Sequence, residues 1–417
     1  MTPRELARRV LERIERDKAW ATPALDGELA RANLEDRDRR LASELVYGVL
    51  RHRTRIDRAL AAHADLKRTP PRVVIALRVA AYQLLFLDRV PAYAVVDDAV
   101  AAARTSGGAK LAGFANAVLR KVGAAPEPEF PDNPRARIAA EFSLPPWIVD
   151  ELAAATDDLP ARAAAFATSA PLIARANRLR TTREALIEEL HETARPVDVP
   201  PGTPQAFTID NLGDPARSPT FVAGRWTVQD AGAQLVAHFA APRAGMKILD
   251  ACAGVGGKAT HLAELADDAA HIDAADRSAT KLDLAAATAQ RLGITSLHRH
   301  VCDLTDPKAP LARDYDLIVL DAPCTGLGVL RRHPDAKWRL IPDDVPRLAR
   351  VQAELLDAVA ARLSPTGALI YSVCTFTRAE GPDQARAFAE RSGLRLVVEH
   401  RTWPPDADAF YLARFER

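Results

Sequence analysis

The sequence predicts a multidomain fold: an all-α N-terminal domain, a small α/β linker subdomain and a doubly wound α/β C-terminal domain. Two periodicities in the 417 residues indicate this arrangement. Apolar residues recur at intervals of three and four through residues 1–125, which indicates packed helices. From Trp226 onward, short apolar runs alternate with helical periods, as in a mostly parallel sheet. We therefore expect domains at 1–125, 126–225 and 226–417.

The N-terminal helices are indicated by three apolar stripes, with no strand-like alternation between them: Leu6, Val10, Ile14; Leu41, Leu45, Val49; and Val74, Leu77, Ala81, Leu84. A Pro-rich stretch, "APEPEFPDNP", then ends the helical pattern and indicates a linker. Residues 126–225 combine helical segments at "PPWIVDELAAA" and "TREALIEELHE" with an extended segment at "PLIARANRL" and a Pro/Gly-rich stretch near "DVPPGTPQ". The pattern in this region predicts linker helices and a small α/β subdomain that is RNA-recognition-like.

Seven apolar runs in the C-terminal domain are expected to be strands. Most of them lack polar alternation, so they are apolar on both faces and belong in a sheet covered by helices on both sides. The runs are "MKILDACAG", "AHIDAADRS", "HRHVCDL", "YDLIVLDAPC", "GALIYSVCTF", "LRLVVEH" and "AFYLARF".

Charge is distributed unevenly along the chain. Residues 1–125 contain 23 Lys and Arg against 15 Asp and Glu, a balance of +8, which leaves 33 against 40, or −7, for residues 126–417. A basic module beside an acidic one favours a nucleic acid or another polyanion as the partner of the first. The alternative is an ordinary solvated surface of charged helices.

Composition argues against several classes of protein. The N-terminus carries Arg and Glu throughout and is not expected to be a signal peptide, and the longest apolar run, "VAAYQLLFL", is far shorter than the ~20 residues of a membrane span. The four cysteines form no CxxC pair and have no suitably spaced His, which disfavours a disulfide framework or a metal site. We expect a cytoplasmic monomer without a metal or a membrane partner.

Glycines follow the first strand of the predicted sheet, where open α/β sheets bind ligands. The sequence "DACAGVGGKATHL" places Asp250 at the strand end and Gly254, Gly256 and Gly257 in the loop, where they allow close approach of a ligand. The loop departs from the P-loop pattern because Cys252 and Ala259 replace its first Gly and its Ser or Thr. It also departs from GxGxxG, so ATP and dinucleotides are both disfavoured.

Acidic residues end the next two strands. Asp276 ends the second strand, where a carboxylate accepts hydrogen bonds from ribose hydroxyls, and Asp303 ends the third, near the expected position of an adenine edge. Three acids and a glycine loop in register suit a nucleoside with an amino-acid tail and no phosphate, which is S-adenosylmethionine. The alternative is that these residues are only the caps and turns of a generic fold.

The fourth and fifth strand ends each carry a cysteine. Cys324 follows "DAP" and Cys374 follows "YSV". The C5 carbon of a pyrimidine becomes a nucleophile when a thiolate adds to C6, and a base must later remove the C5 proton so that the thiolate leaves. Asp321 is a candidate for orienting the base near N3. The residues alone do not assign the two thiols to these steps, since either could attack C6. For Cys252 and Cys302 we favour buried structural roles.

A nucleophilic thiol needs a positive field, because a free thiol titrates near ~8.5. Lys258 and the loop "RRHPDAKW" from Arg331 to Trp338 are candidates to supply it. The loop combines basic side chains with an aromatic ring, a mixture suited to phosphate contact and base stacking. Ordinary surface solvation is the alternative interpretation.

The motifs "VQD", "DACAGVGGK", "DAPCTGLGVLRRHPDAKW" and "YSVCTF" together resemble the signature set of the RNA 5-methylcytosine methyltransferases of the Nol1/Nop2/Sun family. The segments "RLASELVYGVLRHRTRIDRAL", "AAYQLLFLDRVPAYAVVDDAV" and "GFANAVLRKV" resemble the NusB-like RNA-binding domain. The resemblance covers nearly the whole chain. It implies a Rossmann-like class I methyltransferase domain that transfers a methyl group from S-adenosylmethionine to C5 of a cytosine in small-subunit (16S) ribosomal RNA.

The resemblance also implies roles for individual residues. Cys374 matches the family's nucleophile and Cys324 the cysteine that aids release of the product. The implied cofactor contacts are Cys252, Ala253, Gly254, Val255, Gly256, Gly257, Lys258, Asp276, Asp303 and Asp321. Two motifs depart from the family: "GVGGK" replaces Ala-Pro-Gly-Gly-Lys, which removes a backbone restraint from the loop, and "VCT" replaces Thr-Cys-Ser.

Two alternatives in function stay open. One is a sister enzyme that methylates transfer RNA or another ribosomal site. The other is a NusB-like RNA-binding assembly factor whose methyltransferase domain is only a scaffold, which the intact thiols and acids disfavour.

Overall fold

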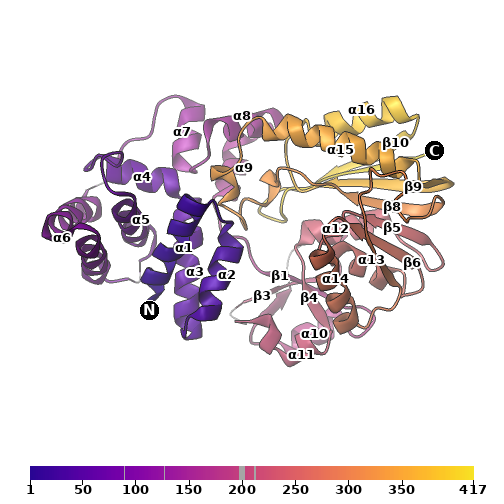
Figure 1. The fold of residues 1–417 in the computed structure, drawn as a ribbon, viewed down its shortest axis with the longest axis horizontal. Coiled ribbons are helices and arrows are strands. Elements are labelled where there is room, and N and C mark those ends of the chain that lie inside the picture. The colour runs from indigo at the N-terminus through magenta and orange to yellow at the C-terminus, as the bar shows by residue number, and fades with distance from the viewer. Residues whose placement is uncertain (89, 126, 197–201, 211–212) are drawn as a thin grey trace. The chain divides into compact units, whose positions relative to one another are not determined.

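A computed structural model of the chain describes residues 1–88, 90–125, 127–196, 202–210 and 213–417 (Figure 1). These residues form two compact units, and each unit consists of two separate stretches of the sequence. One unit contains Met1–Thr168 and Leu330–Arg339, and the second contains Ser169–Val329 and Leu340–Arg417. The predicted Pro-rich linker and the stretch near "DVPPGTPQ" lie partly outside the described residues. The three-domain division itself stays a prediction.

The first unit is helical in its described residues, as its apolar spacing predicts. Its helices are α1 (Pro3–Asp17), α2 (Ala21–Arg31), α3 (Asp36–Arg51), α4 (Arg53–Ala61), α5 (Pro71–Phe86), α6 (Ala92–Ala124), α7 (Pro134–Glu141), α8 (Pro146–Ala155) and α9 (Leu159–Phe166).

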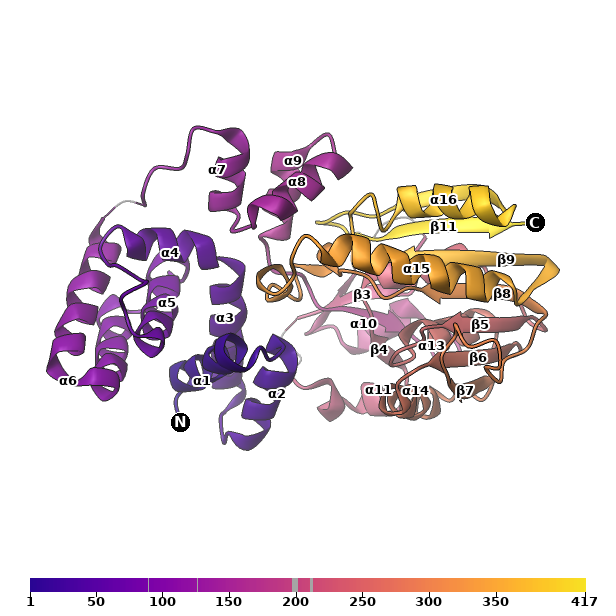
Figure 2. The same cartoon turned by 45° about the horizontal axis from the view of Figure 1, so that its top comes forward.

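Apolar packing around α5 forms the core of this unit. Every residue of α5 from Val73 to Gln83 is buried, and α1, α3, α4 and α6 pack around it. The helix α6 consists of two segments that meet at Gly107 and Gly108, where the backbone is not helical, and the segments lie side by side (Figure 2). Gly108 has φ +73°, a conformation that Gly adopts without strain.

The segment Leu330–Arg339 packs into the helical unit, which contradicts its interpretation as an exposed RNA-contacting loop. Lys337 is 3% exposed, and its Nζ donates to the carbonyl of Arg51 at 2.7 Å. The indole of Trp338 donates to the carbonyl of Leu50 at 2.7 Å, and Asp335 accepts from the backbone N–H of Ala21 at 2.9 Å. Burial and the nearby Arg51 guanidinium hold the pKa of Lys337 well below its usual range.

The second unit begins with a small antiparallel sheet, in the order β2-β3-β1-β4. Its strands are β1 (Ile173–Ala176), β2 (Ala194–Pro196), β3 (Ala206–Ile209) and β4 (Trp226–Val228), accompanied by α10 (Arg183–Glu189), η1 (Pro215–Arg217) and α11 (Pro219–Val222). The predicted small α/β subdomain is therefore present.

A larger sheet follows, with the strand order β10-β11-β9-β8-β5-β6-β7. The five neighbouring strands from β9 to β7 in this order are parallel. The strands are β5 (Lys247–Ala251), β6 (His271–Asp276), β7 (Leu297–Val301), β8 (Tyr315–Asp321), β9 (Leu363–Val373), β10 (Arg395–Arg401) and β11 (Tyr411–Glu416). They correspond to the seven predicted runs. The last two are antiparallel to their neighbours.

Helices cover both faces of the larger sheet, which confirms the doubly wound prediction (Figure 1). One face carries α12 (Ala231–Ala240), α13 (Gly257–Leu265) and α14 (Ala279–Leu292), and the other carries α15 (Asp344–Ala360) and α16 (Pro382–Ser392). Short 3₁₀ turns η2 (Leu327–Val329) and η3 (Ala336–Trp338) lie between β8 and α15. Among the described residues, no helix has the length and apolar character that crossing a bilayer requires.

Candidate active site

Two cysteines meet where β8 and β9 end. These strands are parallel neighbours, and Asp321 pairs with Ser372 in their register. Cys324 and Cys374 therefore leave the sheet at the same edge, and their sulfurs lie 3.4 Å apart. Both cysteines are free, and each residue is partly buried. The structure thus brings together the two cysteines that the sequence placed at neighbouring strand ends.

Lys258 and Asp321 form an ion pair at this edge. Lys258 is the second residue of α13, and its Nζ lies 2.6 Å from Asp321 Oδ2. Ser372 Oγ donates to the other oxygen of Asp321 at 3.2 Å. Burial lowers the pKa of Lys258, but the Asp321 carboxylate, with a smaller contribution from Cys374, outweighs it and leaves the pKa raised. Lys258 is therefore a cation within electrostatic reach of Cys374.

The surroundings of Cys324 disfavour its thiolate. Its hydrogen bond to Cys374, its burial, and the nearby carboxylates of Glu380 and Asp321 all hold the pKa of the Cys324 thiol well above its usual range. Cys252 is also held as a thiol, since burial raises its pKa to about 12. Cys324 is thus expected to keep its proton at neutral pH.

The loop after β5 has a backbone that few residues adopt. Cys252, Gly254 and Gly256 have φ of +65°, +56° and +81°. A Cβ at Gly256 would lie 2.6 Å from the Cβ of Ala285, so the loop approaches α14 too closely for a side chain there. The loop lines a pocket with Gln229, Ala233, Asp250, Cys252, Ala253, Gly254, Val255, Gly257, Lys258, Lys281 and Asp321.

Asp250 lies under this loop as an unusual buried acid. It is 0% exposed, and neither carboxyl oxygen has a hydrogen-bond partner of ordinary geometry among the described residues. Burial, with the nearby carboxylates of Asp321 and Asp276, raises its pKa to about 7. A buried acceptor without a partner is costly, so this carboxyl group is suited to meeting a ligand's donor.

Asp276 ends β6 as the sequence indicated, and Asp303 lies two residues beyond the end of β7, but both already accept hydrogen bonds. Asp276 accepts from the backbone N–H of Gly254 at 3.0 Å and from that of Ser278 at 2.8 Å. Asp303 accepts from Arg277 and Thr305, which lower its pKa to about 2. Neither is among the pocket-lining residues given above.

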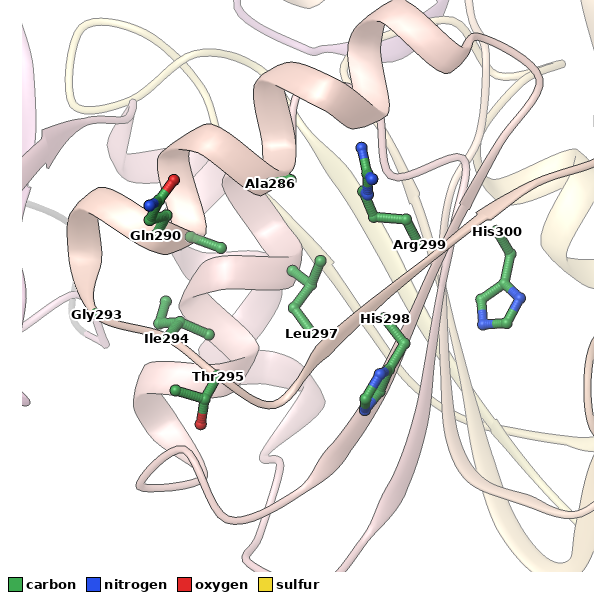
Figure 3. Close-up of a pocket in the computed structure, with 10 residues that line it drawn as sticks. Ala286, Gln290, Gly293, Ile294, Thr295, Leu297, His298, Arg299 and His300 are labelled. Carbon is green, nitrogen blue, oxygen red and sulfur yellow. The ribbon is translucent and has the colours of Figure 1, made fainter.

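A second pocket, between α14 and the outer strand β7, lies away from these residues (Figure 3). It is lined by Gly293, Leu297 and Arg299 together with parts of α14. The pocket-lining residues belong to the second half of α14, the connection after it and the strand β7. It contains none of the predicted site residues. Among the described residues, no cluster of three or more His, Cys, Asp and Glu is arranged to hold a metal.

Sequence reasoning missed Glu380, Gln352 and Gly328. Glu380 is buried and accepts from the backbone N–H of Thr325 at 2.8 Å. Gly328 donates to the carbonyl of Cys374 at 3.0 Å. Gly328 lies in the quoted "TGLG" motif, which was a signal for it, whereas a lone Glu on a turn gives none.

Known proteins resemble both parts of this chain. Residues 237–416 match the family described as 16S rRNA methyltransferase RsmB/F, and residues 1–124 match the NusB family. A probable ribosomal RNA small subunit methyltransferase B of Synechocystis sp. is 34% identical over 411 residues, covering 97% of this chain and 90% of the relative. The chain belongs to the ribosomal RNA small subunit methyltransferase B family.

Further relatives agree with this membership of the methyltransferase B family. The probable methyltransferase B of Bacillus subtilis is 32% identical and covers 97% of this chain and 90% of the relative. The methyltransferase B of Vibrio cholerae is 34% identical and covers 88% and 85%. The chain is thus a methyltransferase of the RsmB/F family, with a NusB domain ahead of its methyltransferase domain.

Solved structures share the fold of this methyltransferase B family member. The crystal structure of PH0851 superposes with a TM-score of 0.83 at 22% identity and covers 100% of this chain and 99% of that one. NSun6 from Pyrococcus horikoshii with SFG has a TM-score of 0.56 at 19% identity and covers 69% and 98%. At these identities the likeness establishes the fold alone.

Proposed function

We propose that this protein transfers a methyl group from S-adenosylmethionine to C5 of a cytosine in small-subunit ribosomal RNA, with Cys374 as the nucleophile. The observation that carries the proposal is the pair of thiols 3.4 Å apart beside the Lys258–Asp321 ion pair. The relatives named ribosomal RNA small subunit methyltransferase B support the substrate class.

Covalent catalysis divides the reaction into an attack on C6 and a later release of the product, so each of two thiols can serve one of these steps. The Cys374 thiolate attacks C6 and forms an S–C6 bond, which makes C5 enamine-like and able to take the methyl group. A base then removes the proton from C5, and the electrons of that C–H bond restore the C5–C6 double bond as the S–C6 bond breaks. Cys374 leaves as a thiolate, and the methylated base is released.

The electrostatics support different roles for the two cysteines. The Lys258 cation lies within electrostatic reach of Cys374, whereas carboxylates surround Cys324 and favour its thiol. A thiolate is the attacking form. We assign the attack to Cys374 and assistance in release to Cys324. Asp321 would orient the cytosine through N3 and the exocyclic amine while holding Lys258.

The chemistry of the pocket fits S-adenosylmethionine. The left-handed loop allows close backbone approach, and the buried carboxyl group of Asp250, which has no hydrogen-bond partner of ordinary geometry among the described residues, lines the pocket and could accept from a donor of the cofactor. The cofactor supplies the methyl group as a sulfonium. Residues 252–258 would hold it, with Asp276 at the ribose, Asp303 near the adenine and Asp321 between cofactor and base. NSun6, a neighbour in fold, was solved with SFG, an analogue of S-adenosylmethionine.

The two thiols have unequal expected phenotypes. Cys374→Ala should abolish methyl transfer without changing cofactor affinity, because activation of C5 is lost. Cys324→Ala should still attack C6 and transfer the methyl group, but elimination should stall. A denaturing gel should then show an RNA-linked form of Cys324→Ala that requires cofactor and is absent from the double variant.

Each other outcome has a definite meaning. If Cys374→Ala traps RNA and Cys324→Ala does not, the two roles are reversed, as in DNA cytosine methyltransferases. Normal turnover by both single variants would rule out covalent catalysis. Bisulfite sequencing of ribosomal and transfer RNA from a deletion strain separates the proposed substrate from the sister-enzyme alternative, and unchanged methylation in both supports the assembly factor.

A further inference from the structure

A buried carboxylate, Glu380, connects the two loops that carry the catalytic cysteines. Glu380 is 0% exposed and lies on the turn between β9 and α16. Among the described residues, neither cysteine side chain is hydrogen-bonded to it, so Glu380 positions the thiols through the residues next to them. The arrangement of those neighbours is specific.

Glu380 holds the loop after Cys324 through Thr325. The backbone N–H of Thr325 donates to Glu380 Oε1 at 2.8 Å, and its hydroxyl donates to Oε2 at 2.6 Å. Gln352 of α15 donates to Oε1 at 3.0 Å and to the carbonyl of Pro323 at 3.0 Å. The residues on both sides of Cys324 are thereby fixed.

The same carboxylate holds the loop after Cys374. Oε2 of Glu380 accepts from the hydroxyl of Thr375 at 3.2 Å and from that of Thr377 at 2.9 Å. The hydroxyls of Thr325 and Thr375 are 3.0 Å apart. All four polar side chains of this cluster, those of Glu380 and the three threonines, are buried.

We propose that Glu380 is a positioning residue that sets the separation and register of the two catalytic thiols. A buried carboxylate needs several donors, and two of those donors, Thr325 and Thr375, directly follow Cys324 and Cys374. Satisfying the charge therefore draws the two loops to one point. The catalytic part of this inference rests on the proposed roles of the two thiols. The hydrogen bonds around Glu380 do not depend on those roles.

The charge of Glu380 has a second consequence. Its carboxylate is among the groups that raise the pKa of the Cys324 thiol. Glu380 therefore helps to keep Cys324 protonated in the resting protein. A neutral residue at this position would remove that contribution as well as loosen the loops.

The thiol–disulfide equilibrium of the two cysteines measures their separation without RNA or cofactor. Oxidised dithiothreitol takes two electrons and two protons from the Cys324 and Cys374 thiols, which become one disulfide, while it becomes the dithiol. The equilibrium constant is the effective concentration of one protein thiol at the other, relative to that of the two thiols of dithiothreitol, so its change between variants reports the change in the protein. Peptide mapping by mass spectrometry assigns the disulfide to this pair rather than to Cys252 or Cys302.

Glu380→Ala should lower the effective concentration by about tenfold or more, because the loops lose their shared acceptor. Glu380→Gln should fall between, since its amide accepts on one side only. Thr375→Val/Thr377→Val releases only the Cys374 loop and leaves Glu380 with donors from Thr325 and Gln352, so it tests the same idea in a protein expected to fold.

The control is Ile272→Ala, which replaces a buried side chain of β6. The cavity that it leaves lowers stability, and the substitution changes no residue of either loop. It should leave the effective concentration at the wild-type value. The proposal is overturned if Glu380→Ala and the double threonine variant match wild type, or if Ile272→Ala lowers the constant as much as they do.

Activity then separates positioning from general damage. Glu380→Gln should lower kcat for methyl transfer while the KM values for cofactor and RNA stay near wild type, and its pH profile should shift as the Cys324 thiol ionises more readily. Because the disulfide equilibrium needs no reaction, it tests Glu380 even if the cysteine adduct proves wrong. If the effective concentration falls but turnover stays intact, Glu380 positions the thiols, and only its importance for catalysis is refuted.

Discussion

Two acids at neighbouring strand ends behave differently because their surroundings differ. Asp321 pairs with Lys258 at 2.6 Å and is partly exposed, whereas Asp250 on β5 is buried without a hydrogen-bond partner among the described residues. The pKa of Asp250 rises to about 7, mainly through burial. Removing a carboxylate from water without a partner favours its neutral form. The residue type alone does not reveal which acid is charged.

Asp276 is the residue whose loss should weaken cofactor binding most directly. Asp276→Ala would remove the proposed acceptor for two ribose hydroxyls, and it removes the acceptor that holds the N–H of Gly254. We expect a loss of roughly 1.5–3 kcal/mol, or about tenfold or more in affinity, by isothermal titration calorimetry. Asp276→Asn keeps one acceptor oxygen and should lose less.

A matched control for Asp276 is Asp283→Ala, an exposed acid on α14 that pairs with Arg299. It should bind cofactor as wild type does. Equal affinities for wild type and Asp276→Ala would remove Asp276 from the ribose site.

At the scale of elements, the register of β8 and β9 places the chemistry. Asp321 lies opposite Ser372, so the turns after both strands project from one edge with their cysteines adjacent. A slip of one residue would move every side chain of β9 to the opposite face of the sheet, and because both faces are packed, the buried run of that strand opposes such a slip. The core therefore fixes the position of the thiols.

Gly328 locks the turn η2 against the end of β9. A Cβ at Gly328 would lie 1.9 Å from the carbonyl oxygen of Ala409 and 2.8 Å from that of Cys374. Gly328→Ala should therefore lower the free energy of unfolding by ~1–3 kcal/mol in urea titrations and slow adduct formation, because the Cys374 backbone must move.

The control for Gly328 is Gly113→Ala in α6, where a Cβ meets nothing within 4 Å. It should be neutral or stabilising by up to ~1 kcal/mol, since Ala favours a helix interior. Stability and adduct formation equal to wild type in Gly328→Ala would contradict the close contact.

At the scale of the whole molecule, segments that are neighbours in the sequence belong to different compact units. The segment Leu330–Arg339 lies between the two cysteines in sequence yet packs within the helical unit. Removing residues 1–125 would expose Lys337 and Trp338, which donate to carbonyls of that region. A truncated protein would therefore confuse loss of RNA contact with loss of packing, so surface substitutions test the basic region better.

Arg37 and Arg40 are exposed basic residues of the helical unit. If the +8 balance of residues 1–125 serves RNA binding, Arg37→Ala/Arg40→Ala should weaken binding and reduce the slope of log K against log salt by roughly 1.4–1.8. Filter binding of ribosomal RNA over a salt series measures the slope.

The comparison variant is Arg243→Ala/Arg313→Ala, which removes two exposed charges near the amino ends of β5 and β8, on the edge opposite the cysteines. Its affinity and slope should match wild type. The same slope in both double variants and in wild type would argue against the basic region as the RNA contact.

The sequence by itself determined the fold class, because helical and strand periodicities reflect local burial and survive in any compact arrangement. Both sheets, the seven strands and the helical N-terminal part agree with it. It also indicated which residues share an edge, because parallel strands end together. Cys324, Cys374, Lys258 and Asp321 do lie together, while their individual roles stay predictions.

Tertiary structure alone decided the contacts between residues that no spacing rule links. Glu380 joins loops fifty residues apart, Asp250 has no hydrogen-bond partner of ordinary geometry in the described part of the chain, and Lys337 donates to a carbonyl 286 positions away. The "RRHPDAKW" loop shows the physical reason. Its charges look solvated in sequence, but a side chain's surroundings come from packing of distant segments, which local composition does not encode.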